Sequence, residues 1–153
     1  MTALDIRAEA PDSADARACV GAYFAELDRR FEGGFDPGAK GYVDPKDAGT
    51  FYVARRDGKP IACGAVKRVA AATFEIKRMW VAPEARGQGV AKALLAALEA
   101  EAVRAGAAHI VLDTNKALRE AHALYRKAGY REIARFNDNP YAHLWFEKTL
   151  SAR

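Results

Sequence analysis

The spacing of apolar residues along the 153-residue chain switches between a period of two and a period of three or four. Alternation of apolar and polar residues is typical of half-buried strands, and spacings of three and four are typical of amphipathic helices. Helices are expected at about 14–31, 89–106 and 117–128, and strands at 4–8, 50–55, 61–69, 73–81, 110–112, 130–135 and 143–149. This order predicts an α/β layered domain with a mixed sheet.

Residues that favour turns and helix ends mark where these elements begin and end. Ser13 or Asp12 is expected to cap the first helix by accepting a hydrogen bond from a free backbone amide. The turn 57–60, which contains Asp-Gly, predicts a hairpin, and Gly129 is expected to end the third helix. The glycine-rich stretch 33–49 is expected to be a loop with a short helical turn.

The strand expected at 73–81 changes the parity of its apolar residues part-way along. Phe74 and Ile76 are apolar on one parity, Met79 and Val81 are apolar on the other, and two polar residues stand between the pairs. One extra residue at this switch, a β-bulge, would keep all four apolar side chains on the core face and leave backbone groups open to a ligand. A strand buried on both faces near its end is the alternative explanation.

A loop with two glycines separates this strand from the second helix. Glycine lets the backbone approach a ligand closely, and the free amides of a helix N-terminus favour a phosphate. A plain turn before a surface helix explains the spacing equally well. The dinucleotide fingerprint and the P-loop both fail, because Lys92-Ala93 stands where those motifs need other residues. The candidate phosphate-binding residues are Arg86, Gly87, Gln88, Gly89, Val90, Ala91 and Lys92.

Composition narrows the class of protein. The chain is 50% hydrophobic and 29% charged, and we expect residues 1–153 to form a single globular domain. The diffuse net charge of +4 disfavours nucleic acid as a partner. Cys19 and Cys63 are too few for a disulfide framework, and the histidines lack metal-ligand spacing, so no metal is expected. Neither a signal peptide nor a membrane span is recognisable, which predicts a cytoplasmic protein without membrane contact.

Two motifs give the chain a resemblance to the GNAT superfamily of acyl-CoA-dependent N-acetyltransferases. Arg86, Gly89 and Ala91 match its signature of glutamine or arginine, two residues, glycine, one residue, then glycine or alanine. The stretch 121–130 is similar to the second motif of this family, AxxLYxxxG followed by Phe or Tyr. The order of the expected elements also matches over 4–149. The resemblance implies a GNAT-like mixed, mostly antiparallel sheet of six to seven strands flanked by helices, with a β-bulge in the fourth strand.

The resemblance also implies acetyl-CoA as the co-substrate and assigns residues to it. Amides of residues 87–91 are expected to hold the pyrophosphate, and Tyr125 is expected near the thioester sulfur. Many relatives carry asparagine at the position of Leu118, and Asn115 is the candidate to replace it. The residues expected to pair with the pantetheine arm through their backbone are Met79, Trp80 and Val81.

Proton transfer suggests the catalytic groups. An alkyl amine with a pKa near 10.4 is mostly protonated at neutral pH, so a base that removes its proton helps the reaction. Glu75, on the polar parity of the bulged strand, is the candidate general base, and a surface carboxylate paired with Lys77 or Arg68 is the alternative. Tyr125 is the candidate general acid, by proton transfer or by a hydrogen bond alone, and a packing role is the alternative.

The acceptor side is expected to involve the first helix, the loop up to Tyr42 and the loop 137–141. A helix face carrying Phe24, Leu27 and Phe31 is nevertheless more often core than pocket wall. Amino acids, small polyamines, aminoglycoside-like drugs and peptide N-termini are all compatible acceptors. The candidate acceptor-binding residues are Tyr23, Glu26, Phe31 and Asn137.

Together these features predict transfer of an acetyl group from acetyl-CoA to a primary amine by direct attack in a ternary complex. A non-catalytic acyl-CoA-binding regulatory module on the same fold is the alternative. Trp145 and Phe146, expected near an exposed sheet edge, are compatible with a homodimer, and a monomer is equally compatible.

Overall fold

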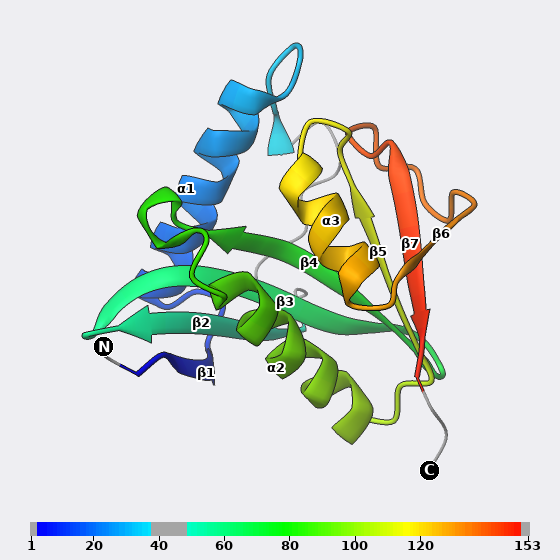
Figure 1. Ribbon diagram of the computed structural model, residues 1–153, viewed down its shortest axis with the longest axis horizontal. Coiled ribbons are helices and arrows are strands. Elements are labelled where there is room, and N and C mark those ends of the chain that lie inside the picture. Colours follow the sequence, from blue (N-terminus) through cyan, green and yellow to red (C-terminus); the bar gives the residue numbers. More distant parts are fainter. Residues whose placement is uncertain (1–2, 38–48, 151–153) are drawn as a thin grey trace.

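One seven-stranded sheet organises the protein, with strands in the order β1-β2-β3-β4-β5-β7-β6 (Figure 1). The computed structural model describes residues 3–37 and 49–150. The strands are β1 (Asp5–Glu9), β2 (Thr50–Arg56), β3 (Lys59–Ala70), β4 (Thr73–Val81), β5 (His109–Thr114), β6 (Arg131–Ile133) and β7 (Leu144–Thr149). Every pairing is antiparallel except that of β4 with β5. The predicted mixed, mostly antiparallel sheet is therefore confirmed.

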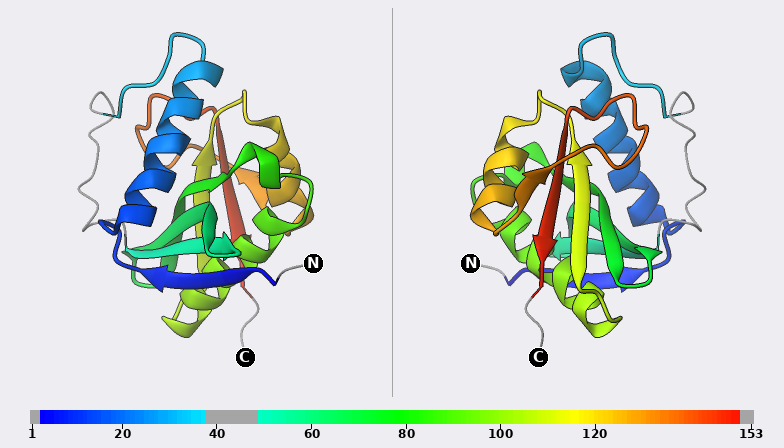
Figure 2. Two further views of the ribbon diagram at one scale, coloured as in Figure 1. Left: turned by 90° about the vertical axis from the view of Figure 1, so that its left-hand side faces the viewer. Right: turned by 90° about the vertical axis from the view of Figure 1, so that its right-hand side faces the viewer.

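Helices cover both faces of the sheet (Figure 2). Helix α1 (Ala14–Arg30) lies on one face, where Ala16 and Cys19 pack on residues of β2 and β3. Helices α2 (Val90–Arg104) and α3 (Arg119–Lys127) lie on the other face, over the larger core cluster. The sheet therefore separates two apolar layers. No helix among the described residues is long and apolar enough to cross a bilayer.

The residues expected to end the elements do so. Ser13 caps α1, because its hydroxyl accepts a hydrogen bond from the Ala16 amide at 3.1 Å. Asp57 and Gly58 both take the positive φ of a tight hairpin turn between β2 and β3, with φ of 54° and 75°. Gly129, with φ of 97°, follows α3.

Most predicted boundaries differ from the observed ones by one or two residues, and local hydrogen bonds explain two of these differences. Helix α3 begins at Arg119 instead of 117, because the Asn115 side chain accepts from the Ala117 amide at 2.8 Å and holds a turn there. Strand β6 ends at Ile133 instead of 135, where the chain turns and Arg135 donates to the Asn137 carbonyl. Residues 38–48 of the expected loop lie outside the described part of the chain.

The predicted β-bulge in β4 is confirmed. Cys63 pairs with Trp80 and Ala65 with Lys77, so two residues of β4 oppose Gly64 alone. Arg78 takes a left-handed backbone conformation at the bulge, with φ of 56°. As expected, the apolar side chains on both sides of the bulge reach the same core cluster: Phe74, Ile76, Met79 and Val81.

The C-terminal aromatic residues do not lie at a sheet edge, contrary to the expectation behind the homodimer. Strand β7 pairs with β5 on one side and β6 on the other. Phe146 is completely buried, and the Trp145 indole donates to Asn137 and packs against Arg135. These two side chains serve the fold of this chain and do not offer a docking surface.

We predict that Gly64→Ala lowers the free energy of unfolding by about 1–3 kcal/mol. A Cβ at this position would lie 2.9 Å from Leu98 Cδ1 and 3.1 Å from Met79 Cγ, and Leu98 is fully buried. The matched control is Gly21→Ala in α1, which meets open space and is expected to stabilise by about 0.5–1 kcal/mol. Urea unfolding measures both, and a Gly64→Ala protein as stable as the parent would contradict the packing described.

Candidate active site

The strands β4 and β5 separate in the middle of the sheet, and the separation defines the site (Figure 1). Among the described residues their parallel pairing covers only Thr73–Glu75 and His109–Val111. Beyond Glu75, β4 continues through the bulge towards α1, while β5 runs on beside β7. A cavity of about 360 Å³ is lined by residues of both diverging strands, α1 and α3. The sheet is therefore open at the point where Glu75 lies.

Glu75 is a buried carboxylate that lines this cavity. Along β4 it alternates with Phe74 and Ile76, so its side chain is on the opposite face of the strand. Its Oε1 is 3.6 Å from Lys77 Nζ. Arg68 points elsewhere, with hydrogen bonds to the carbonyls of Ala71 and Ala105. Of the two partners considered for Glu75 in the alternative interpretation, Lys77 lies within ion-pair distance, but Glu75 is buried and is not the surface carboxylate of that alternative.

Tyr125 of α3 lines the same cavity, so the structure brings the two candidate catalytic residues together. Burial, with a smaller contribution from Asp113, raises the pKa of the Tyr125 phenol well above its ordinary value, so the hydroxyl stays protonated at neutral pH. Its ring also packs on Tyr130 and Phe146, with centroids 5.8 and 6.1 Å away. The residue combines a packing role with a protonated hydroxyl at the cavity.

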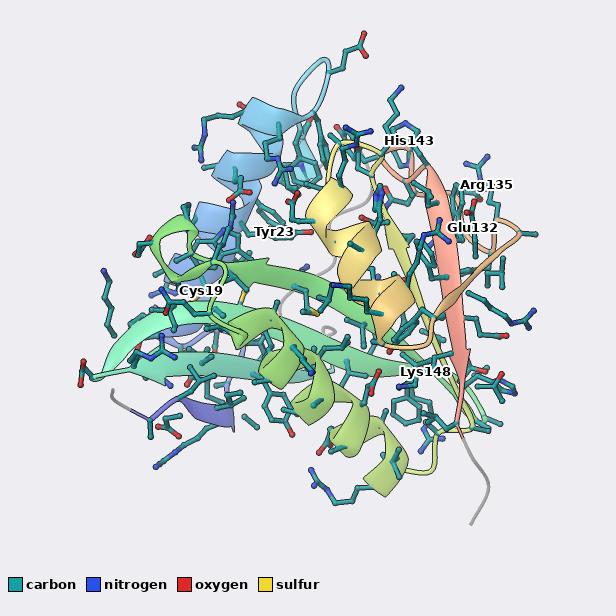
Figure 3. The ribbon with its side chains drawn as sticks, viewed as in Figure 1. Cys19, Tyr23, Glu132, Arg135, His143 and Lys148 are labelled. Atoms are coloured by element: carbon teal, nitrogen blue, oxygen red, sulfur yellow. The ribbon has the colours of Figure 1, made fainter. Side chains whose placement is uncertain are left out.

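Tyr23 approaches the site from the opposite side. Figure 3 shows its side chain extending from α1 towards α3. Burial is the largest cause that raises the pKa of its phenol, and the neighbouring Tyr125 adds to the effect. The hydroxyl-bearing rings of Tyr23 and Tyr125 therefore both line the cavity, one from α1 and one from α3.

The loop before α2 has open backbone groups. Gly87 and Gly89 have φ of 77° and 80°, and a Cβ on either would meet nothing within 4 Å. Gly89 is the N-cap of α2 and supplies no side-chain hydrogen bond, so the first amides of the helix have no cap. Gln88 holds the loop by accepting from Arg56 and donating to the Glu84 carbonyl, while Lys92 is exposed. This arrangement can bind an anion.

Glu26 does not line the cavity, contrary to the expectation that it binds the acceptor. Its Oε1 lies 2.5 Å from Arg86 Nη2 and accepts from the Trp80 indole at 3.2 Å, and its Oε2 lies 3.1 Å from Arg30 Nη1. Arg30 in turn pairs with Glu120 at the start of α3. The carboxylate therefore joins α1 to the loop and to α3.

Asn115 and Leu118 both line the cavity, but the Asn115 amide is engaged in the fold. Its Nδ2 donates to the Tyr141 carbonyl at 2.7 Å, and its Oδ1 accepts from the Ala117 amide. Asn115 thus fixes the loop that follows β6 against the start of α3.

The acceptor side contains more residues than the sequence indicated. Phe24, Leu27 and Phe31 line the cavity, and Leu27 and Phe31 are also buried, so this helix face serves both as core and as cavity wall. The part of the expected loop from residue 38 to Tyr42 lies outside the described residues. Asn137 lines the cavity and donates to Asp113 at 2.6 Å. Phe35, Asn139 and Tyr141, which belong to the two loops expected on the acceptor side, also line the cavity, whereas Asp113 is a cavity residue that sequence reasoning missed.

Asp113 had a signal in the sequence that was not used. It is an acidic residue near the end of an otherwise apolar strand, the position from which side chains reach a site at a sheet opening. Its carboxylate accepts from the side-chain amides of Asn137 and Asn139, at 2.6 and 3.1 Å. Asp113 therefore both faces the cavity and holds the loop that closes it.

Comparison with known proteins agrees with this geometry. Residues 21–130 match the Acetyltransferase (GNAT) family, and the chain belongs to this family. It is 38% identical over 105 residues to an IAA acetyltransferase of Azospirillum brasilense, and this match covers 65% of this chain and 67% of that protein. It is 43% identical over 76 residues to an aminoalkylphosphonate N-acetyltransferase of Salmonella typhimurium, which covers 50% of this chain and less than half, 44%, of that protein.

A solved structure supports the fold. A GNAT family acetyltransferase from Elizabethkingia anophelis with acetyl-CoA bound superposes with a TM-score of 0.72, at 17% identity, over 96% of this chain and 98% of that chain. The match of residues 21–130 to the family therefore confirms the resemblance to the GNAT superfamily stated from the sequence.

We predict that Glu26→Gln lowers the free energy of unfolding at pH 7 by about 1–2 kcal/mol. The effect is smaller than for a fully buried ion pair, because Arg30 and Arg86 are partly exposed and solvent screens their charges. Burial opposes ionisation of Glu26, but hydrogen bonds from Arg86 and Arg30 outweigh it and hold the pKa below its ordinary value of 4.5. The stabilisation is therefore present above pH 4.5 and is lost as the pH falls through the folded-state pKa.

Urea unfolding of the parent and of Glu26→Gln from pH 7 to pH 3 measures this effect. The two free energies of unfolding are expected to converge as the pH falls below 4.5. A difference that stays constant over the whole range would contradict the ion pairs described for Glu26.

Proposed function

We propose that this protein transfers the acetyl group of acetyl-CoA to a primary amine. The observation that carries the proposal is that Glu75 and Tyr125, from two different elements, line one cavity at the opening between β4 and β5. The N-acetyltransferase from Salmonella and the GNAT structure with acetyl-CoA bound support both substrates. We also propose that residues 1–153 form one domain and that this domain contains the whole site.

The residues of this chain fit the chemistry of acetyl-CoA. Uncapped amides at the start of α2, with Gly87 and Gly89 in left-handed conformations, would hold the pyrophosphate. Lys92 is exposed beside them and adds positive charge, whereas the Arg86 guanidinium is already paired with Glu26. Backbone groups of 79–81, beyond the end of the β4–β5 pairing, would hold the pantetheine arm as an added strand does. When bound, acetyl-CoA supplies an activated acyl group.

Glu75 is the general base in this proposal. It accepts a proton from the amine, whose nitrogen forms a bond to the acetyl carbonyl carbon while the carbon–sulfur bond breaks. Tyr125 donates a hydrogen bond or its proton to the departing sulfur, which has a low enough thiol pKa to need little assistance. The reaction yields an N-acetyl amide and free CoA, and it needs both substrates in the site together.

An acetyl-CoA turnover screen against a panel of primary amines tests this function. Release of free thiol that depends on an amine, with a matching N-acetylated product by mass spectrometry, is the expected result. Binding of CoA without turnover of any amine would contradict the enzyme proposal and would favour a regulatory module that binds acyl-CoA.

For the cofactor loop, we predict that Gly89→Asp weakens CoA binding about 10- to 100-fold, because it brings a negative charge to the pyrophosphate position. Gly89→Asn is the matched control, since it has the same shape, no charge and an equal tolerance of positive φ. Calorimetry on both folded variants separates charge from backbone strain. Equal CoA affinity in the Asp and Asn variants would rule out a phosphate at this loop.

For the base, we predict that Glu75→Gln lowers kcat about 10²–10⁴-fold at pH 7 and that activity recovers as the pH approaches the pKa of the amine. The amide keeps shape and hydrogen bonding but cannot take the proton. A defect in KM alone would mean that Glu75 only binds a cationic acceptor. A variant with parental kcat from pH 6.5 to 9 would show that another group is the base.

A further inference from the structure

Five aromatic residues form one continuous wall of the cavity. This aromatic wall is assembled from α1, the segment that follows it and the loop between β6 and β7. Ring centroids of neighbouring members lie 4.8 to 5.9 Å apart. The members are Tyr23, Phe24, Phe31, Phe35 and Tyr141, and each lines the cavity.

Hydrogen bonds hold the aromatic wall in place from behind. The Phe35 amide donates to Asp28 Oδ1 at 2.9 Å, and the Asp36 amide donates to the Tyr141 hydroxyl at 2.9 Å. The Tyr141 amide donates to Asn139 Oδ1, and its carbonyl accepts from Asn115. Rings fixed in this way need little ordering when a ligand binds, which favours affinity.

The members of the wall remain partly exposed, with the exception of Phe31. Rings that served only as core would be fully buried, as Phe51 and Phe146 are. The half-buried faces of Phe24, Phe35 and Tyr141 therefore offer apolar surface to an occupant of the cavity. A planar aromatic group suits such a surface, because offset or edge-to-face packing of rings adds to simple burial of area.

The charges that the described residues bring to the cavity balance. Within 3–37 and 49–150, three carboxylates and three cationic side chains line it, so these residues supply no excess negative charge to bind a polycation. Glu75 is close to Lys77, and Asp113 accepts from two side-chain amides. An acceptor with a single ammonium group fits this balance better than a polyamine or an aminoglycoside does. The charged lining residues are Glu75, Asp113, Asp138, Lys67, Lys77 and Arg78.

From the wall and the charge balance together, we infer that the acceptor is an arylalkylamine, a single primary amine carried on an aromatic ring. The inference rests on the proposed acetyl transfer and names the substrate class for the same site. The ring packs on the aromatic wall, and the amine points towards Glu75. Phe35 and Phe24 are thereby specificity-determining residues.

The test compares kcat/KM for 2-phenylethylamine, n-butylamine and spermidine with acetyl-CoA and the full chain. The expected result is a value for 2-phenylethylamine at least about 10-fold above that for n-butylamine, because the ring buries additional apolar area. Phe35→Leu and Phe24→Leu are each expected to lower the ratio of these two values about 2- to 10-fold. The exposed Phe136, which does not line the cavity, gives the control Phe136→Leu, with a ratio equal to that of the parent.

Each outcome has a distinct meaning. Two results would overturn the substrate class and leave acetyl transfer in place. One is a kcat/KM for spermidine or n-butylamine equal to that for 2-phenylethylamine. The other is an unchanged ratio of kcat/KM values in both wall variants, when both still bind CoA. Absence of turnover with every amine of the broader panel would overturn the acetyl-transfer proposal itself, and the substrate class with it. Thermal unfolding and CoA affinity of each variant establish that it is folded.

Discussion

The partial pairing of β4 with β5 is the constraint on which the rest of this structure depends. Two parallel strands that stayed paired to their ends would bury all their backbone groups in the sheet and leave no opening. Here the pairing ends at Glu75 and Val111, and the bulge at Arg78 turns β4 away. The opening is tolerated because side chains of α1 and α3 fill its borders and because β4 stays paired with β3. Glu75, a buried carboxylate, lies at the end of the paired region, where the opening begins.

The same opening connects the two faces of the sheet. On one face are the uncapped amides of α2 and the buried Tyr125 of α3, which suit a phosphate-bearing thioester. On the other face are α1 and the aromatic wall, which suit an apolar amine. The ion-paired Glu26 and Arg30 connect α1 to the loop before α2 and to α3. Glu75 can therefore be reached from two faces of the sheet that differ in chemistry. Direct transfer between two substrates bound together requires such an arrangement.

Much of this architecture could be predicted from the sequence because its signals are local. The parity change after Ile76 predicted the bulge, and the glycines at 87 and 89 predicted an open turn before α2. The acceptor side was less predictable because it depends on residues that meet only in the folded chain. Glu26 and Arg86 are 60 positions apart, and their pairing depends on how α1 lies on the sheet. The hydrogen bond that holds the aromatic wall from behind likewise joins Asp36 to Tyr141, 105 positions apart.

The most direct test of the central claim is an NMR titration of the isotope-labelled protein with acetyl-CoA, following backbone amide shifts. If the gap between β4 and β5 holds the pantetheine arm and the start of α2 holds the pyrophosphate, the largest shifts will fall on the amides of residues 79–81 and 87–92. The β1–β2 pair, at the far edge of the sheet, should change little. Saturable shifts confined to residues outside the opening, or none at millimolar acetyl-CoA, would contradict the account.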